Sequence, residues 1–253
     1  MDVAEKLDVL AVGAHPDDIE ICCGGTVCLL VDQGYRVGIV DLTRGELGSR
    51  GSAEQRAKEA ETARNILGVP VRINLGLPDG DIANTKPNQE ALISTIRAHR
   101  PDIVLVGAPE DRHPDHGDAT RLCTSAIFYA GLAKIETRSA DGPQEAWRPS
   151  HTLHYMQGLN FEPDLVVDVS TVWPRRMDAV RAYASQVHSD RYKETSGEPE
   201  TFISDPGFIR FIEARAQSLG YRTGAAYGEG FLYRHGPMGV ADLVAFLGRK
   251  ART

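Results

Sequence analysis

Two short segments carry most of the side chains that can bind a metal ion or move protons. Residues 14–18 read AHPDD and directly follow an apolar stretch. Residues 113–116 read HPDH and begin a few residues after another apolar stretch. Within each segment, two potential ligands are three residues apart, a spacing that brings both to one side of a turn. Two imidazoles and one carboxylate, with a position left for water, are the ligands of a catalytic zinc site. The pattern therefore favours a metal-dependent hydrolase.

Such a hydrolase also needs a general base beside the attacking water and a donor for the charge that develops on the substrate oxygen. Asp17, next to Asp18, is the candidate base. His113, beside Asp115, is the candidate donor, as an imidazolium held by a carboxylate. Each residue alone has an ordinary explanation, such as a turn, a helix N-cap or a surface loop. Their combination is what indicates chemistry.

Two strands must bring these segments together. Residues 8–13 and 102–107 are apolar and predict buried strands that end where the two loops carrying the segments begin. Strands and helices alternate along the chain, which predicts an α/β fold with a Rossmann-like, mostly parallel sheet and helices on both faces. In the order 3-2-1-4-5 with C-terminal additions, the first and fourth strands are neighbours at the switch point where such sheets bind ligands. We therefore expect the two segments to face each other.

Local signals set some helix boundaries. A helix is expected over residues 26–33, after two glycines loosen the backbone. Ser52 and Gln55 have the spacing of a capping box at the start of the next helix. Asp115 is placed to cap the long helix that follows the second segment.

Length and composition limit the fold and the partners. The 253 residues predict one domain, 1–253, with a core over 7–135 and a C-terminal part over 150–235 that completes the sheet and the pocket. The net charge of −7 and the lack of a basic run argue against nucleic acid as a partner. There is no signal-peptide pattern, no run long enough to span a bilayer and no disulfide-like cysteine spacing. These features predict a cytoplasmic protein without membrane insertion.

The two segments resemble the signature motifs of the PIG-L/LmbE-type deacetylases. Members of that family are zinc-dependent hydrolases that remove an acetyl group from conjugates containing N-acetylglucosamine. The similarity extends to the loop 43–51 (TRGELGSRG), to 111–119 (DRHPDHGDA) and to 227–231 (YGEGF). The resemblance implies zinc binding by His15, Asp18 and His116, a base at Asp17, oxyanion stabilisation by His113 and orientation of His113 by Asp115. Fe²⁺, Co²⁺ and Mn²⁺ suit the same donor set.

Within the family, the chain is most similar to the bacillithiol-pathway branch, which deacetylates N-acetylglucosaminyl malate. That similarity rests on 110–116 (EDRHPDH), 182–186 (AYASQ), 213–215 (EAR) and 227–231. Residues 157–160 (QGLN) depart from the branch at an expected substrate loop. An inositol conjugate, a chito-oligosaccharide or an antibiotic precursor therefore stays open as the substrate.

Four more side chains are candidate contacts for a small N-acetylated sugar conjugate. Arg56 can pair with a substrate carboxylate, and Arg112 can reach the substrate or pair with Glu110. Glu46 can contact sugar hydroxyls. His154 either lines the pocket or is a hydrogen-bonded core histidine.

Two non-enzymatic functions also stay open. A dinucleotide-binding module fits the position of the first strand, but the chain lacks G-x-G-x-x-G and places two carboxylates where a pyrophosphate would bind. A metal-binding regulatory protein would not need Asp17 or His113. The polar loops 43–51, 136–150 and 189–200 can form a lid or subunit contacts, so a homo-oligomer is not excluded.

Overall fold

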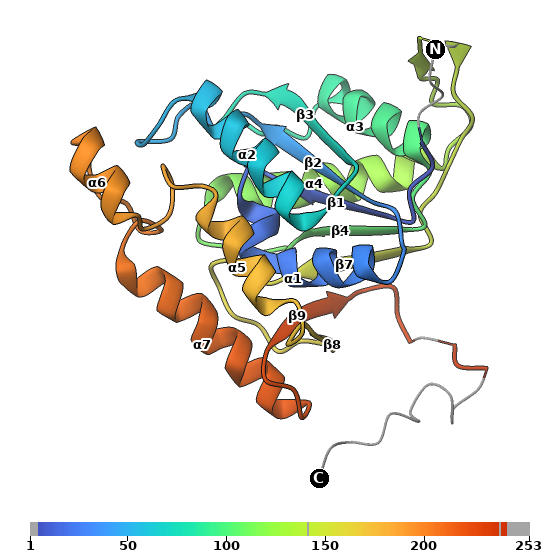
Figure 1. Ribbon diagram of the computed structural model, residues 1–253. Coiled ribbons are helices and arrows are strands. Elements are labelled where there is room, and N and C mark those ends of the chain that lie inside the picture. The colour runs from blue at the N-terminus through green and yellow to red at the C-terminus, as the bar shows by residue number, and fades with distance from the viewer. Residues whose placement is uncertain (1–4, 141, 238, 242–253) are drawn as a thin grey trace.

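The computed structural model describes residues 5–140, 142–237 and 239–241 (Figure 1). Its centre is a seven-stranded sheet with the order β3-β2-β1-β4-β7-β9-β8. The predicted order 3-2-1-4-5 is confirmed, because β7 supplies the fifth parallel strand beside β4. β9 and β8 extend the sheet with antiparallel pairing. The strands are β1 (Val9–Gly13), β2 (Val37–Thr43), β3 (Val71–Leu77), β4 (Ile103–Gly107), β7 (His151–Tyr155), β8 (Leu165–Asp168) and β9 (Gly228–Tyr233), with a separate pair, β5 (Arg138–Ser139) and β6 (Gly142–Pro143).

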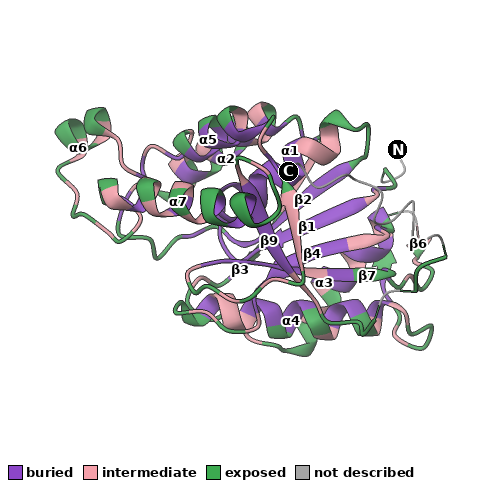
Figure 2. Cartoon of the chain, turned by 90° about the horizontal axis from the view of Figure 1, so that it is seen from below, coloured by how far each residue is buried: buried purple, intermediate pink, exposed green. Residues whose placement is uncertain are grey.

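Helices cover both faces of the sheet, as predicted (Figure 2). One face carries α1 (Asp18–Asp32), α2 (Ala53–Leu67) and α5 (Trp173–Arg181), and the other carries α3 (Lys86–His99) and α4 (Pro114–Ala130). α7 (Pro206–Arg222) packs against β9 and β8, while α6 (Asp190–Ser196) projects at the edge of the molecule (Figure 1).

β1 is buried on both faces because it lies at the centre of the sheet. Val9 and Ala11 pack into the core under α1, α2 and α5, whereas Leu10 and Val12 pack into the core under α3 and α4. A parallel strand covered on both faces needs such a continuous apolar run. Its carboxyl end, at Gly13, therefore opens at the middle of one edge of the sheet.

The first helix corrects the prediction of a helix over 26–33. α1 begins at Asp18 and is interrupted at Cys23, whose φ and ψ of −146° and 20° are not helical. The interruption frees backbone amides, and the Glu229 carboxylate accepts hydrogen bonds from the N–H groups of Gly25 at 2.9 Å and Thr26 at 2.7 Å. The two glycines therefore mark a kink within one longer helix, with the expected segment as its second half.

The helix caps agree with the sequence at α2 and differ at α4. Ser52 caps α2 by accepting a hydrogen bond from the Gln55 amide at 3.2 Å, as predicted. The prediction that Asp115 caps α4 is wrong, because His113 holds the N-cap position. Pro114 sets the start of the helix, since its missing N–H and fixed φ suit the first helical position.

Both parts of the predicted 1–253 unit contribute to the sheet, although its ends lie outside the described residues. Residues 7–135 supply β1 to β4, and residues 150–235 supply β7 to β9. None of the helices in the described part of the chain combines the length and apolar character that a membrane span requires.

Candidate active site

A cavity of about 440 Å³ opens at the carboxyl ends of β1 and β4. Both predicted segments line it, from 15–18 and 113–116. The opposite wall comes from residues 201–203 and the first turns of α7. The cavity therefore lies at the switch point of the sheet, where ligands bind in open α/β folds.

Three potential metal ligands converge in this cavity. His15, Asp18 and His116 each offer a ligand atom, and these atoms lie within 4.8 Å of one another. His116 Nε2 is 3.3 Å from Asp18 Oδ1, and His15 Nδ1 is 3.7 Å from Asp18 Oδ2. Folding thus brings together two segments that are far apart in sequence, as the predicted strand order requires.

The remaining nitrogen of each imidazole faces a carboxylate. His116 Nδ1 is 2.9 Å from Asp111 Oδ1. His15 Nε2 is 3.0 Å from Asp79 Oδ1 and 3.2 Å from Asp115 Oδ2. Histidines that bind metals commonly donate their second N–H to a carboxylate, which fixes the ring and its tautomer. These contacts leave His15 Nδ1 and His116 Nε2 available as ligands on the side of Asp18.

The electrostatics of the cluster also fit a divalent cation. Burial disfavours the charged form of His15, but hydrogen bonds to Asp115 and Asp79 raise its pKa to about 9. Burial acts in the same way on His116, but the charges of Asp18 and Asp111 and the hydrogen bonds to them together raise its pKa to about 10. Burial opposes ionisation of Asp18, but the two imidazoles hold its pKa well below the usual range. The carboxylates therefore attract positive charge to the place where the donors meet.

Asp17 is adjacent to Asp18 but has different surroundings. It precedes α1 with a φ of 123°, a conformation that is strained for any residue except glycine. Its Oδ2 accepts a hydrogen bond from Arg56 Nη2 at 2.8 Å, and Arg56 Nε donates to the Pro16 carbonyl at 2.8 Å. Burial raises the pKa of Asp17 to about 6, although Arg56 opposes the shift. A buried carboxylate with this pKa can accept a proton near neutral pH.

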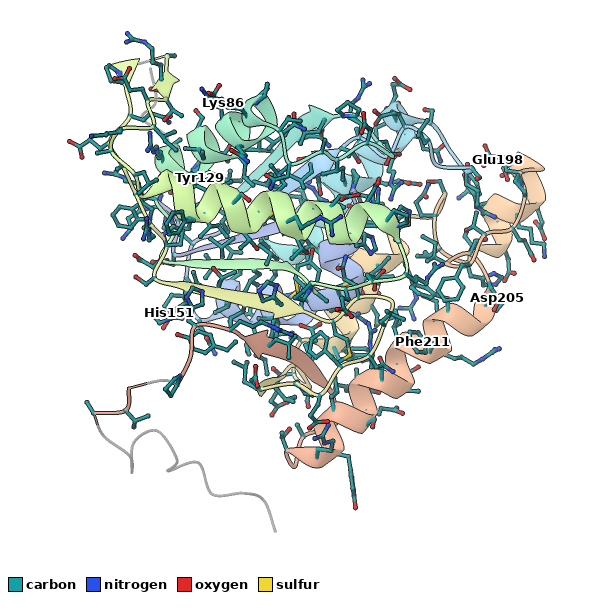
Figure 3. The ribbon with its side chains drawn as sticks, turned by 180° about the vertical axis from the view of Figure 1, so that it is seen from behind. Lys86, Tyr129, His151, Glu198, Asp205 and Phe211 are labelled. Carbon is teal, nitrogen blue, oxygen red and sulfur yellow. The ribbon has the colours of Figure 1, made fainter. Side chains whose placement is uncertain are left out.

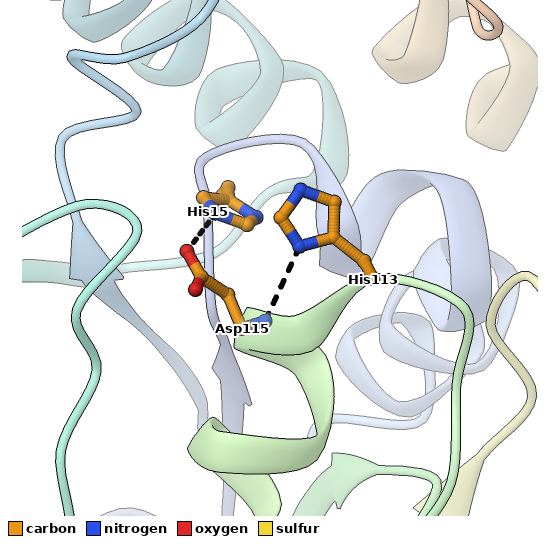
Figure 4. Close-up of side chains that lie close together, drawn as sticks. All are labelled: His15, His113 and Asp115. Atoms are coloured by element: carbon orange, nitrogen blue, oxygen red, sulfur yellow. Dashed lines mark hydrogen bonds and ion pairs between the residues drawn. The ribbon is translucent and has the colours of Figure 1, made fainter.

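A backbone amide holds the His113 ring. The resemblance implies instead that the Asp115 carboxylate orients it. The Asp115 N–H donates to His113 Nδ1 at 3.3 Å, while the Asp115 carboxylate contacts His15 and accepts from the Gly80 N–H at 2.9 Å (Figure 4). The geometry differs because both residues lie at the start of α4, where backbone amides are free. Burial and the nearby imidazoles of His15 and His116 lower the pKa of His113, which favours the neutral ring over the predicted imidazolium. Since Nδ1 accepts, the ring proton lies on Nε2.

Two of the four candidate substrate contacts line the cavity. Arg56 does so while paired with Asp17. Arg112 also lines it, and its guanidinium carbon lies 3.9 Å from the ring centre of Phe202. Within the described ranges, Arg112 forms no ion pair with Glu110.

The other two candidates lie outside the lining of the cavity. Glu46 accepts hydrogen bonds from the Asp79 and Arg44 amides, both at 3.2 Å, and so stabilises the loop 43–51. His154 is buried, and its Nδ1 lies 2.8 Å from the Gly107 carbonyl oxygen. That contact matches the alternative of a hydrogen-bonded core histidine.

Sequence reasoning assigned no site role to several side chains that line the cavity, among them Asp79, Asp111, Phe202 and Arg215. For Asp79 a signal existed, since it follows β3 at the same edge of the parallel sheet. Asp111 lies just before the HPDH segment, but the spacing argument gave it no role. Phe202 carries no local signal, and Arg215 is marked only by the similarity at 213–215, because the packing of the C-terminal part is what brings both to the cavity.

Comparisons with known proteins agree with the geometry. Residues 10–127 match the family model described as PIG-L, GlcNAc-PI de-N-acetylase. The diacetylchitobiose deacetylase of Thermococcus kodakarensis is 31% identical over 196 residues, which cover 72% of this chain and 71% of that protein. The chain belongs to the PIG-L deacetylase family.

Two further proteins are similar to this chain. The conserved protein TT1542 from Thermus thermophilus, whose crystal structure is known, is 35% identical in sequence. Its structure superposes with a TM-score of 0.81, and the match covers 93% of this chain and 98% of that one. The 4-oxalmesaconate hydratase of Pseudomonas putida is 27% identical over 208 residues, which cover 76% of this chain and 78% of that protein. Because proteins similar to this chain carry names for different reactions, the function of this chain must be argued from its site.

Proposed function

We propose that this chain is a metal-dependent deacetylase of an N-acetylglucosamine conjugate, with N-acetylglucosaminyl malate as the candidate substrate. The observation that carries the proposal is the convergence of His15, Asp18 and His116 in a cavity that Asp17 and His113 also line. A metal-binding module without turnover would need neither of the last two. The relative named diacetylchitobiose deacetylase supports an N-acetylated sugar as the substrate class.

The proposed metal ligands are His15, Asp18 and His116, with zinc as the first candidate. Two nitrogens and one carboxylate also suit Fe²⁺, Co²⁺ and Mn²⁺. A cation bound there would lower the pKa of water and polarise the acetamide carbonyl. Asp79, Asp111 and Asp115 would act through the imidazoles, by fixing their tautomers and orientations.

The protein side chains then divide the proton transfers. Asp17 accepts the proton of the water whose oxygen attacks the acetamide carbon. His113 donates a hydrogen bond from Nε2–H to the carbonyl oxygen as negative charge develops on it. Asp17 returns its proton to the nitrogen as the C–N bond breaks, so acetate and the free sugar amine are the products. Arg56 holds Asp17 in place through their ion pair.

The two parts of the chain form one catalytic unit in this proposal. Residues 7–135 provide the ligands and the base, and residues 150–235 provide the opposite wall of the cavity. Both are needed to enclose a sugar conjugate and exclude water from it.

Acetate release tests the proposal. The purified protein is assayed with N-acetylglucosaminyl malate, N-acetylglucosaminyl inositol and N,N′-diacetylchitobiose, before and after treatment with a chelator. We expect acetate from at least one substrate, loss of turnover after chelation and recovery on adding Zn²⁺. Absence of acetate from the whole panel, or turnover that chelation leaves unchanged, would refute it. A hydratase would add water to a double bond and release no acetate, so this assay separates the two reactions.

A further inference from the structure

The wall of the cavity opposite the metal ligands combines aromatic rings with guanidinium groups. Phe202 precedes α7, and Phe208, Phe211 and Arg215 lie on it. Figure 3 labels Phe211 on this helix, together with Asp205 at its start. The acetamide group must lie at the ligands for cleavage, so this wall faces the group to which the sugar is linked.

Arg215 is the unusual residue of this wall. Its guanidinium carbon lies 5.2 Å from the ring centre of Phe211, and Nη1 donates a hydrogen bond to the Gln157 carbonyl oxygen. No carboxylate in the described part of the chain forms an ion pair with it. Removal from water disfavours the charged form and lowers the pKa of Arg215. A cation kept in such a place without a counter-ion destabilises the fold, and an anion would offset that cost.

The carboxylate that shares a small adjoining cavity with Arg215 is already engaged. Glu229 lines that cavity too, but its oxygens accept hydrogen bonds from the Gly25 and Thr26 amides and from the Thr26 hydroxyl. Its nearer cation is Arg176, with Nε 3.7 Å from Oε1. Glu229 is therefore a structural acceptor for α1, and within the described residues Arg215 forms no ion pair with it or with another carboxylate.

Arg112 also lines the cavity, although its side chain is exposed. It lies over Phe202, and no ion pair joins it to any of the residues described. The neighbouring carboxylate, Asp111, is used by His116 Nδ1 through Oδ1 and by the Gly158 amide at 2.6 Å through Oδ2. Both arginines lie beside residues 157–158, since Arg215 donates to the Gln157 carbonyl and a Cβ on Gly158 would lie 3.3 Å from Arg112 Cγ.

We propose that Arg215, with Arg112, forms a subsite for a carboxylate on the group linked to the sugar, and that Phe202 and Phe211 contact the carbon skeleton of that group. The planar fork of arginine matches a carboxylate with two hydrogen bonds, and stacking on a ring restricts the motion of each guanidinium. The proposal rests on the proposed function, because the orientation of the conjugate follows from acetamide cleavage at the ligands. It defines the preferred substrates as acidic conjugates.

The test compares an acidic conjugate with its uncharged counterpart. N-acetylglucosaminyl malate and its dimethyl ester differ in charge while their skeletons are the same. We expect wild-type kcat/KM to be higher for the acid, and Arg215→Gln to lower it roughly 10- to 100-fold for the acid, mainly through KM. Turnover of the ester should change much less. Arg215→Lys should recover part of the loss, since it keeps the charge.

A matched control uses the exposed Arg210 on the same helix. Arg210→Gln should leave kcat/KM for both substrates unchanged. An equal loss for acid and ester in Arg215→Gln, or a wild-type enzyme without preference for the acid, would overturn the subsite and leave the proposed function standing.

Direct binding keeps the subsite testable in a protein that shows no turnover. Calorimetry with N-acetylglucosaminyl malate and its dimethyl ester should show tighter binding of the acid to the wild type, and Arg215→Gln should remove that difference. If acid and ester bind equally, the subsite is wrong whatever reaction the site performs.

Discussion

At the scale of the residue, two adjacent aspartates have opposite environments. The Asp18 carboxylate faces the imidazoles of His116 and His15, whereas the Asp17 carboxylate faces Arg56. This difference follows from the break in conformation at Asp17, where φ is 123° and α1 begins. In the proposed function, this difference separates metal binding at Asp18 from proton transfer at Asp17.

Asp17→Asn should therefore separate the two roles. We expect the variant to retain its metal and to lose roughly 100- to 10,000-fold in kcat, because the amide cannot accept a proton. Metal analysis and acetate release measure the two effects, with Asp18→Asn as the matched change that should lose the metal. If Asp17→Asn loses the metal and Asp18→Asn keeps it, the base and the ligand are interchanged.

The contact between Asp111 and His116 predicts a change in metal affinity. In Asp111→Asn, the Nδ1–H of His116 would lose its charged acceptor, so metal affinity should fall roughly 10- to 100-fold. Competition with a chromogenic chelator measures it. Asp118→Asn is the control, since Asp118 lies on α4, the helix that carries His116, and pairs with Arg121 on its surface. Equal affinities in the wild type and Asp111→Asn would show that this contact does not support the ligand.

The sequence predicted the residues that act through local spacing and missed those that act through packing. His15, Asp18 and His116 were predictable because each belongs to a compact segment that follows a strand. The lowered pKa of His113 was not predictable, because it depends first on burial in the folded cavity and then on the imidazoles of His15 and His116. The similarity at 213–215 marked Arg215 without giving it a role, since its lack of an ion pair among the described residues is a property of the folded cavity.

At the scale of the element, α1 shows how a distant residue shapes a helix next to the site. Its kink at Cys23 is supported by Glu229, which lies 204 residues from Gly25 in sequence. A pattern confined to residues 18–33 cannot reveal such a partner. For this reason the sequence predicted only the second half of the helix.

Gly25→Ala tests the kink. A Cβ at this position would lie 2.8 Å from Val169 Cβ and 2.8 Å from Glu229 Oε1, so β9 and the end of β8 would have to shift. We expect the free energy of unfolding to fall by about 1–3 kcal/mol, as for other overpacked sites, in urea denaturation.

The matched control for this change is Gly117→Ala in α4. A Cβ there would meet its nearest atom only at 3.7 Å, so the higher helix propensity of alanine should leave stability equal or raised. A Gly25→Ala protein as stable as the wild type would contradict the tight packing described for α1.

At the scale of the whole molecule, the sheet was the most predictable feature. Alternating strands and helices predicted the order through β7, and the meeting of the two segments followed from it. The C-terminal part was expected to complete the sheet, but the antiparallel pairing of β9 and β8 was not predictable, because packing decides how a strand joins the edge of a sheet. The protruding α6 and the position of Glu198 and Asp205 between α6 and α7 (Figure 3) likewise depend on tertiary structure.

Stability against acid depends on a histidine far from the cavity. His99 is buried with Nδ1 2.8 Å from the Glu5 carbonyl, and burial lowers its pKa below the ordinary 6.5. As the pH falls below about 6.5, the unfolded chain therefore binds the proton more readily than the native state, and the stabilisation from neutral His99 is lost.

His99→Gln should thus cost more free energy of unfolding at about pH 7.5 than at about pH 5.5, because only the wild type loses stability through this titration. Urea denaturation of both proteins at the two pH values measures the gap. A gap that stays constant or widens on acidification would mean that His99 is not held neutral by the fold.

The central claim is that one cation is shared by ligands from two distant segments. The direct measurement is titration of the metal-free protein with Co²⁺, followed by its visible absorption, in the wild type and in the His15→Ala and His116→Ala variants. The account predicts one Co²⁺ per wild-type chain and a large loss of affinity in each variant. Undiminished binding in either variant, or no binding by the wild type, would contradict it.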